Sequence, residues 1–381
     1  MLFSAGSNAH GQLSNGSDDD SHVFRPCSFE GGDFPAGWRL ADLAFGANHT
    51  LALLEDAESG KPELWGCGDG RKGQLGPKYA ATPVLSPLRL PLESHGLASY
   101  SPRLVAAAWE TSYVVLSAPE RADVLVSMGS NDFGVLGVGP KPIEPLNIVE
   151  LGDILLGSAL DIRAIVAGQN HVVVALGMAG GADDVVVGWG ASRHGQLGDA
   201  KKPFAAAPAV ILRGICRSIA LGHQHTIVLD SSGGLVAFGS NRKQQLDGLD
   251  RLHARSVHCT WNGTYVVTTE GHLLSTGSNI QGQLGRDTNS CIHYVAFPFD
   301  AAAHDLVQLA CGSEHVLAVF RTPQSALEVW GWGWNEHGNL GSGTTEDAHM
   351  PRKLWPSDST PTIPGPVRIW AGLGTSWIAV P

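Results

Sequence analysis

Short apolar runs separated by glycine-rich turns recur along the whole chain. Residues 63–65 and 185–187 form two such runs, and each is followed directly by a glycine. Apolar, β-branched runs of this length between turn residues are typical of β-strands. The glycine lets two backbones approach closely, and a following Ser-Asn or Asp-Gly pair turns the chain. The pattern predicts an all-β protein of short strands joined by tight turns.

One glycine motif occurs seven times and organises the chain. Its fullest copy is Gly-Trp-Gly-Trp-Asn-Glu-His-Gly-Asn-Leu-Gly at residues 331–341. The glycines that open the turn in the seven copies are Gly6, Gly68, Gly129, Gly190, Gly239, Gly277 and Gly333. Seven matches to one template identify a repeat protein, so each copy must first be interpreted as architecture.

A second motif alternates with the first and consists of a turn followed by an apolar strand. Copies that contain a histidine lie at residues 44–53, 167–174, 221–229 and 311–319. Two variant copies, at 108–115 and 260–267, carry a tryptophan in the turn and no histidine. Polar hairpins at 230–234 and 270–272 return the chain to the next glycine motif.

The repeats favour a closed ring of sheets. Seven units of short strands, each unable to bury its own faces, are expected to form a seven-bladed β-propeller over residues 1–381 as one domain. The first strand, residues 2–5, and the last, residues 377–380, are predicted to pair, because each would otherwise be an open edge. The motif glycines are 62, 61, 61, 49, 38 and 56 residues apart. The excess falls in Pro-rich segments 77–102, 139–157 and 343–366, which are expected to be surface loops.

Composition and charge narrow the function. The chain has 48 glycines, 16% charged residues and a formal net charge of −11, which disfavours chromatin or membrane-surface binding as the main activity. Six scattered cysteines without a Cys-x-x-Cys pair favour reduced thiols in a cytosolic or nuclear protein. No signal peptide and no apolar run of membrane length is predicted.

Cofactor and catalytic sites are not expected. The Gly-x-Gly strings lack both a following helix and the Gly-Lys-Ser/Thr of a phosphate loop. The recurring histidines occupy one slot in different repeats, so each is interpreted as a buried residue that ties down neighbouring backbone; they are His49, His171, His225 and His315. His223 and His225 are a weak metal pair without a third ligand nearby in sequence. No Ser/His/Asp or paired-carboxylate constellation stands apart from the repeats, so the chain is predicted not to be an enzyme.

The tandem of Gly-x-Asn-x-x-Gly-Gln-Leu-Gly with Gly-x-x-His-Thr-x-Ala-Leu resembles the regulator of chromosome condensation family across essentially the whole chain. That resemblance implies a seven-bladed propeller. The two tryptophan-bearing turns, the 330–339 string and the ending at 374–380 are similar to a fungal member of the family. This closer resemblance implies a heterodimer with a small zinc-binding diphthamide biosynthesis protein. The pair would serve diphthamide synthesis and Elongator-dependent modification of wobble uridine in tRNA.

The partner-binding residues are expected among side chains at motif turns, because interfaces concentrate energy in Trp, Tyr and Arg anchors. The candidates are Trp109, Glu110, Trp261, Trp334, His337 and Trp377. Packing between blades is the alternative role for each tryptophan. Nucleotide exchange on a Ran-like GTPase, the activity of the family's founding member, is the alternative function.

Overall fold

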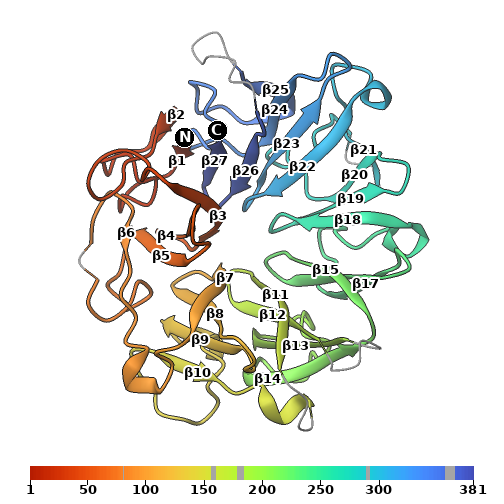
Figure 1. Ribbon diagram of the computed structural model, residues 1–381. Helices are drawn as coiled ribbons and strands as arrows, with labels where there is room; N and C mark the ends of the chain where they lie inside the picture. Colours follow the sequence, from red (N-terminus) through yellow and green to blue (C-terminus); the bar gives the residue numbers. More distant parts are fainter. Residues whose placement is uncertain (80, 156–159, 178–183, 289–291, 357–364) are drawn as a thin grey trace. The chain divides into compact units, whose positions relative to one another are not determined.

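The computed structural model describes residues 1–381 except 80, 156–159, 178–183, 289–291 and 357–364 (Figure 1). The described residues form 27 strands and five short 3-10 helices, so the prediction of an all-β chain is confirmed. Two compact units divide the chain. The terminal unit comprises Met1–Ala9, Asp18–Cys27 and Ala220–Pro381, and the middle unit comprises His10–Ser17 and Ser28–Ile219.

The middle unit contains three antiparallel sheets of four strands. Sheet 1 is ordered β3 (Trp38–Phe45), β4 (His49–Asp56), β5 (Pro62–Gly68), β6 (Ser86–Pro87). Sheet 2 is ordered β10 (Asn147–Val149), β9 (Val124–Gly129), β8 (Thr111–Ser117), β7 (Ser101–Ala107). Sheet 3 is ordered β11 (Asp161–Ala167), β12 (His171–Gly177), β13 (Asp184–Ala191), β14 (Phe204–Arg213). The 3-10 helices here are η1 (Glu93–His95), η2 (Asp132–Gly134) and η3 (Gly152–Leu155).

Four further sheets belong to the terminal unit, although β15 crosses the unit boundary. Sheet 4 has three strands, β15 (Cys216–Leu221), β16 (His225–Asp230) and β17 (Leu235–Gly239). Sheet 5 is ordered β18 (Ala254–Cys259), β19 (Gly263–Thr268), β20 (Leu273–Gly277), β21 (His293–Tyr294). Sheet 6 is ordered β22 (Asp305–Cys311), β23 (His315–Arg321), β24 (Leu327–Gly333), β25 (Ala348–Trp355). Sheet 7 is ordered β2 (Ser21–Pro26), β1 (Leu2–Gly6), β27 (Thr375–Ala379), β26 (Arg368–Ala371). The remaining 3-10 helices are η4 (Leu249–Arg251) and η5 (Ala301–Ala303).

The predicted pairing of the two chain ends is confirmed in sheet 7. Strand β1 runs antiparallel to β27 with Leu2 opposite Ala379 and Ser4 opposite Trp377. Beyond the paired strands, the backbone N–H of Val380 donates to the carbonyl of Met1 at 2.9 Å. Figure 1 shows both termini at this sheet. The sheet is thus built from both ends of the chain, and neither end strand is left as an open edge.

The three Pro-rich segments are not loops throughout, so that expectation is wrong in part. Each contributes the outermost strand of its sheet, namely β6, β10 and β25. A fourth strand is missing only where the spacing between motif glycines is shortest, at 38 residues, in the described part of sheet 4. The number of residues between successive motif glycines therefore indicates whether the intervening segment is long enough to form an outer strand.

The opening glycines of the seven motifs have a common steric cause. All seven have positive φ, from +95° at Gly68 to +123° at Gly277. A Cβ at any of them would lie 2.2–2.4 Å from the carbonyl oxygen of the turn before the paired strand, such as Asn48 opposite Gly68. Only glycine fits this backbone, as the sequence predicted. The glycine-motif loops and the second-motif turns therefore lie at the same end of each sheet, which we name the loop end; the other is the hairpin end.

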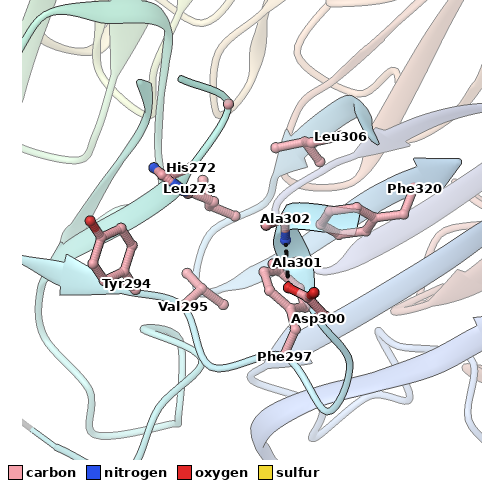
Figure 2. A pocket seen from close by; sticks show the side chains of 11 residues that line it. His272, Leu273, Tyr294, Val295, Phe297, Asp300, Ala301, Ala302, Leu306 and Phe320 are labelled. Atoms are coloured by element: carbon pink, nitrogen blue, oxygen red, sulfur yellow. Dashed lines mark hydrogen bonds between the residues drawn. The ribbon is translucent and has the colours of Figure 1, made fainter. Parts of the chain in front are cut away.

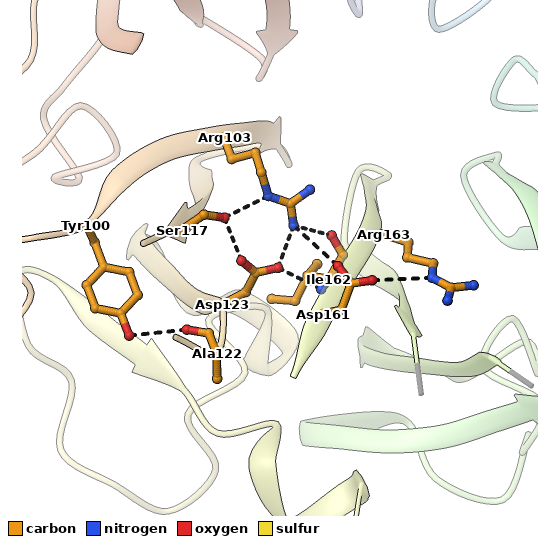
Figure 3. Close-up of polar contacts among 8 residues, drawn as sticks. All are labelled: Tyr100, Arg103, Ser117, Ala122, Asp123, Asp161, Ile162 and Arg163. Atoms are coloured by element: carbon orange, nitrogen blue, oxygen red, sulfur yellow. Dashed lines mark hydrogen bonds and ion pairs between the residues drawn. The ribbon is translucent and has the colours of Figure 1, made fainter. Parts of the chain in front are cut away.

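Partly buried ion pairs tie neighbouring sheets together at the hairpin end of the middle unit (Figure 3). Asp123 of sheet 2 accepts a hydrogen bond from the backbone N–H of Ile162 in sheet 3 at 2.8 Å. Arg103 donates to Asp123 and to the carbonyl oxygen of Ile162. Asp184 repeats the arrangement one sheet later, since it accepts from the backbone N–H of Cys216 at 2.8 Å. These contacts fix the sheets from which the loop-end residues project.

Candidate functional site

The loop end of the middle unit exposes one of the predicted tryptophans. The side chain of Trp109 is 38% exposed, and Glu110 beside it is partly exposed. The turn itself is rigid, because Trp109 donates its backbone N–H to Gln169 at 3.1 Å and accepts from Ala47 at 2.8 Å. Hydrogen bonds of this kind link consecutive second-motif turns. The indole is therefore presented on a fixed backbone.

Phe133 is a loop-end residue that the sequence analysis missed. It occupies the tip of the glycine-motif loop in sheet 2, is 52% exposed, and has a positive φ of 58°. A bulky residue in this region of backbone space is strained, and such strain is concentrated at functional sites. The exposed aromatic could have been noticed because the six other copies have a charged or polar residue in this slot.

In the terminal unit, Trp261 occupies the same position of its turn as Trp109. Its backbone N–H donates to Ser313 at 2.6 Å, and its carbonyl accepts from His223 at 3.0 Å. The indole is partly exposed and lies against the His223 ring, with centroids 5.5 Å apart. His223 thus supports the tryptophan, and this stacking contact was not predicted.

A buried carboxylate lies beneath this surface. Glu314 accepts hydrogen bonds from the side-chain amides of Asn262 at 2.5 Å and Gln283 at 2.9 Å. Burial raises the pKa of Glu314 to about 7, although the two amides act in the opposite direction. The backbone carbonyl of Glu314 also accepts from the N–H of Trp334 at 2.9 Å. Glu314 therefore connects the Trp261 turn to the Trp334 loop. It belongs to the second-motif turn that follows the Trp261 turn, so the sequence around Trp261 gives no sign of it.

Trp334 and His337 lie together in the glycine-motif loop of sheet 6. Their rings meet edge to face at 5.4 Å, and the Trp334 indole N–H donates to Glu336 at 3.3 Å. His337 Nδ1 lies 2.7 Å from a carboxylate oxygen of Asp20. Asp20 belongs to the acidic run at 18–20, and its other oxygen accepts from the backbone N–H of Asn8 at 2.7 Å. Both rings remain partly exposed.

Trp377 is a correction to the predicted set. Its side chain is fully buried in sheet 7, and its indole N–H donates to the Thr375 hydroxyl at 3.1 Å. It lies in strand β27 opposite Ser4 and has the packing role that was the alternative for each tryptophan. A partner could not reach it without unfolding the sheet that joins the chain ends.

The histidines of the second motif are buried structural residues. His49 Nε2 lies 2.8 Å from the Ser112 hydroxyl, and His225 Nε2 lies 3.1 Å from that of Thr264. His315 Nε2 lies 3.3 Å from the backbone carbonyl of Thr375. Burial lowers the pKa of each of these three from 6.5 to about 4, so the rings are neutral at physiological pH. Of these three rings, those of His49 and His225 meet side-chain hydroxyls of the next repeat, and that of His315 meets backbone as predicted.

Within the described residues, no group of three or more His, Cys, Asp or Glu side chains could hold a metal ion. Cys27, Cys67 and Cys259 are buried thiols, Cys216 and Cys311 are partly exposed thiols, and Cys291 lies outside the described residues. No helix in the part of the chain described here is long and apolar enough to cross a membrane. The loop ends of the sheets thus present indoles on hydrogen-bonded turns with charged and polar neighbours.

Known proteins with similar sequences match most or all of the chain. An RCC1 repeat-containing protein of Schizosaccharomyces pombe is 27% identical over 100% of this chain and 99% of its own length. The secretion-regulating guanine nucleotide exchange factor of Mus musculus is 28% identical over 92% of this chain and 78% of its own length.

Solved structures agree on the fold. Human WBSCR16 superimposes with a TM-score of 0.72 at 20% identity, covering 99% of this chain and 98% of its own. Prp20p from Saccharomyces cerevisiae gives 0.71 at 19% identity, covering 99% and 90%. At this identity the likeness concerns the fold alone, the seven-bladed β-propeller. The family model described as RCC1-like domain matches residues 1–378, and the chain therefore belongs to the RCC1-like family.

Proposed function

We propose that the chain is a non-enzymatic protein-interaction platform whose main contact surface is the loop end of the terminal unit. The observation that carries this proposal is the pair of partly exposed indoles, Trp261 and Trp334, held on hydrogen-bonded turns with His337 beside them. Rigid aromatic side chains bury a large area at little conformational cost, which is why they dominate binding energy at interfaces. Trp109 and Glu110 on the middle unit are further candidate contact residues.

The partner that we propose is a small zinc-binding diphthamide biosynthesis protein, bound as a heterodimer. The support is the resemblance of the tryptophan-bearing turns and the 330–339 string to the fungal alpha-tubulin suppressor protein. On this proposal the complex supports diphthamide synthesis and Elongator-dependent modification of wobble uridine in tRNA. On this proposal the chain grips and orients the partner.

Calorimetric titration of the zinc-binding protein into the chain tests the proposal. Trp261→Ala and Trp334→Ala should each weaken binding by about thirtyfold, or about 2 kcal/mol. Trp330→Ala is the matched control, because Trp330 lies within β24 and its indole N–H donates to Glu328, towards the hairpin end of sheet 6. Normal binding by both loop-end variants, with the fold intact, would place the site elsewhere.

A second candidate, nucleotide exchange on a Ran-like small GTPase, is favoured by the names of two relatives. One is called a secretion-regulating guanine nucleotide exchange factor, and the structure of Prp20p is described with its binding to Gsp1p and histones. Release of a fluorescent GDP analogue from a Ran-like GTPase distinguishes the two functions. Our proposal expects the unstimulated rate of release in the presence of the chain, whereas acceleration by orders of magnitude would replace it with the exchange function.

A further inference from the structure

A cavity between sheets 5 and 6 lies at the hairpin end of the terminal unit, away from the loop end (Figure 2). It measures about 250 Å³. Its position follows from the register of β19 and β20, in which Gly263 and Gly277 pair at the loop end and Val267 and Leu273 pair at the other. The hairpin residues Gly271 and His272 form one edge, and η5 forms the other.

The floor of the cavity is preformed by core side chains. Leu273, Val295 and Leu306 line it and are almost fully buried. Phe297 and Phe320 complete it, with their rings edge to face and centroids 4.8 Å apart. A cavity with such walls favours an apolar group over water, because the walls offer water few hydrogen-bond partners. The volume suits one large side chain rather than a drug-sized ligand.

The rim of the cavity carries one fixed carboxylate. Asp300 caps η5, with one carboxylate oxygen accepting from the backbone N–H of Ala302 at 3.0 Å. Figure 2 shows Asp300 and Ala302 on one side of the opening, with His272 and Tyr294 on the other. Tyr294 is 52% exposed and meets the His272 ring edge to face at 5.4 Å. The mouth is therefore amphipathic: aromatic on one side, anionic on the other.

A second, polar cavity of about 380 Å³ adjoins the first. The two share Gly271, His272, Ala301, Ala302 and Leu306. Glu270 and Asp305 line the second cavity, together with Arg255, whose guanidinium donates to the carbonyl of Leu306 at 3.0 Å. The two cavities thus contain three carboxylates, counting Asp300, and one guanidinium that is already engaged. An occupant with a positive charge complements them.

We infer that these adjoining cavities bind an extended, basic segment of a partner protein, with an aromatic or long aliphatic side chain in the first and a Lys or Arg in the second. Side chains two positions apart in an extended segment point to the same side, so the recognised pattern is an apolar residue, any residue, then a basic residue. The aromatic group fills the apolar cavity, and the cation meets Glu270 and Asp305 in the second cavity, with Asp300 at the mouth of the first. This site is independent of the loop-end surface.

Methyl NMR of the full chain tests the inference with the peptide acetyl-Gly-Phe-Ser-Arg-Gly-amide. The methyl signals of Ala302 and Leu306 should shift and saturate. Replacing Phe with Gly, or Arg with Glu, in the peptide should weaken binding at least about tenfold, because each removes one of the two anchors. Absence of saturable shifts would overturn the inference, and so would equally tight binding of phenethylamine, which would indicate a small-molecule site.

Two protein variants locate the site. Asp300→Asn keeps an oxygen for the Ala302 N–H but removes the charge, and should weaken the peptide about fivefold. Ala302→Phe fills the opening from an exposed backbone position and should abolish binding. Asp18→Asn, a charge change elsewhere in the terminal unit, is the matched control and should bind normally. Unchanged affinity in both Asp300→Asn and Ala302→Phe, with the wild-type melting temperature, would overturn the inference.

Discussion

The two tryptophan-bearing turns, 109–110 in the middle unit and 261–262 in the terminal unit, share one backbone but differ in the location of their charge. In each, the tryptophan N–H donates to the next second-motif turn, at Gln169 in one and Ser313 in the other. The first turn carries Glu110 and is followed by Asn170; the second carries Asn262 and is followed by Glu314. The amide and the carboxylate have exchanged places. The repeat dictates the backbone, and side-chain substitution at equivalent slots makes each surface distinct.

The same comparison extends into the core. Tyr113 and Trp189 both donate to the carbonyl of Val135 in the middle unit, at 2.6 Å each. Tyr265 and Trp332 both donate to the carbonyl of Gln283 in the terminal unit, at 2.5 and 2.9 Å. All four aromatic side chains are fully buried. In each unit the tyrosine of the pair lies four residues after the exposed tryptophan, so equivalent Tyr-Trp pairs anchor the strands that follow the two turns.

The largest expected effect tests whether the two Tyr-Trp pairs are equivalent. Trp189→Ala and Trp332→Ala should each lower the free energy of unfolding by about 3–5 kcal/mol, because each leaves a large cavity and removes one of the two hydrogen bonds to the shared carbonyl. Urea unfolding followed by circular dichroism measures both, with exposed Trp109→Ala as the control that should change stability by less than about 1 kcal/mol. If only one of the two variants lost this much unfolding free energy, the two Tyr-Trp pairs would contribute unequally to stability.

Glu314→Gln should have the next largest effect, and it depends on pH. The folded pKa of about 7 exceeds the ordinary value of 4.5, so the folded state binds more protons than the unfolded state between these pH values. The stability that Glu314 contributes is fully present below pH 4.5 and is lost as pH rises through 7. Gln is neutral at both pH values and has no such loss. The free energy of unfolding of Glu314→Gln, relative to wild type, should therefore be up to about 3 kcal/mol higher at pH 8 than at pH 4.5. The Asn262 amide can turn over to accept from the new N–H group.

Chemical denaturation at pH 4.5, 6 and 8 measures this effect. Asn170→Glu is the reciprocal change in the middle unit, since it adds a carboxylate beside Glu110. It should be less stable than wild type at pH 8 and recover towards pH 5. Parallel stability curves for wild type and Glu314→Gln across this pH range would show that Glu314 is not the titrating group.

Smaller losses of stability are expected from two hydroxyls that directly follow the tryptophan turns. Each contacts the buried histidine of the preceding repeat. Ser112→Ala and Thr264→Val remove the hydroxyls that meet His49 and His225. Each should cost about 1–2 kcal/mol, because a buried ring nitrogen loses its partner. Thermal melts at pH 7.5 compare the two. If the Thr264 variant melts like wild type while the Ser112 variant does not, the two turns support their neighbours differently.

Much of the fold was readable from the sequence because it depends on backbone sterics. Gly46, Gly222 and Gly312 make room for a histidine three residues later, since a Cβ there would lie 2.0–2.1 Å from the ring. The tryptophan turns have lost both partners: Ala108 and Thr260 replace the glycine, and Thr111 and Gly263 replace the histidine. Because the glycine and the histidine are replaced together, this steric dependence can be seen in a single sequence.

The site was only partly predictable because exposure depends on contacts between distant residues. Trp109, Trp261, Trp334 and Trp377 look alike as turn-adjacent tryptophans, yet the last is buried by pairing with a strand from the other end of the chain. Glu314 is buried through Asn262 and Gln283, which are 52 and 31 residues away. The local pattern carries no signal for such contacts. The missing fourth strand of sheet 4, by contrast, could have been inferred from its 38-residue spacing.

Hydrogen–deuterium exchange of the chain with and without the zinc-binding partner tests the central claim most directly. Binding at the loop end of the terminal unit should slow exchange in the backbone around 261–263, 313–314 and 334–338, because these turns lie under the contact surface. Exchange at the 269–272 hairpin, at the opposite end of the same sheets, should be unchanged. Protection confined to the hairpin end, or no protection in either region at saturating partner, would contradict the account.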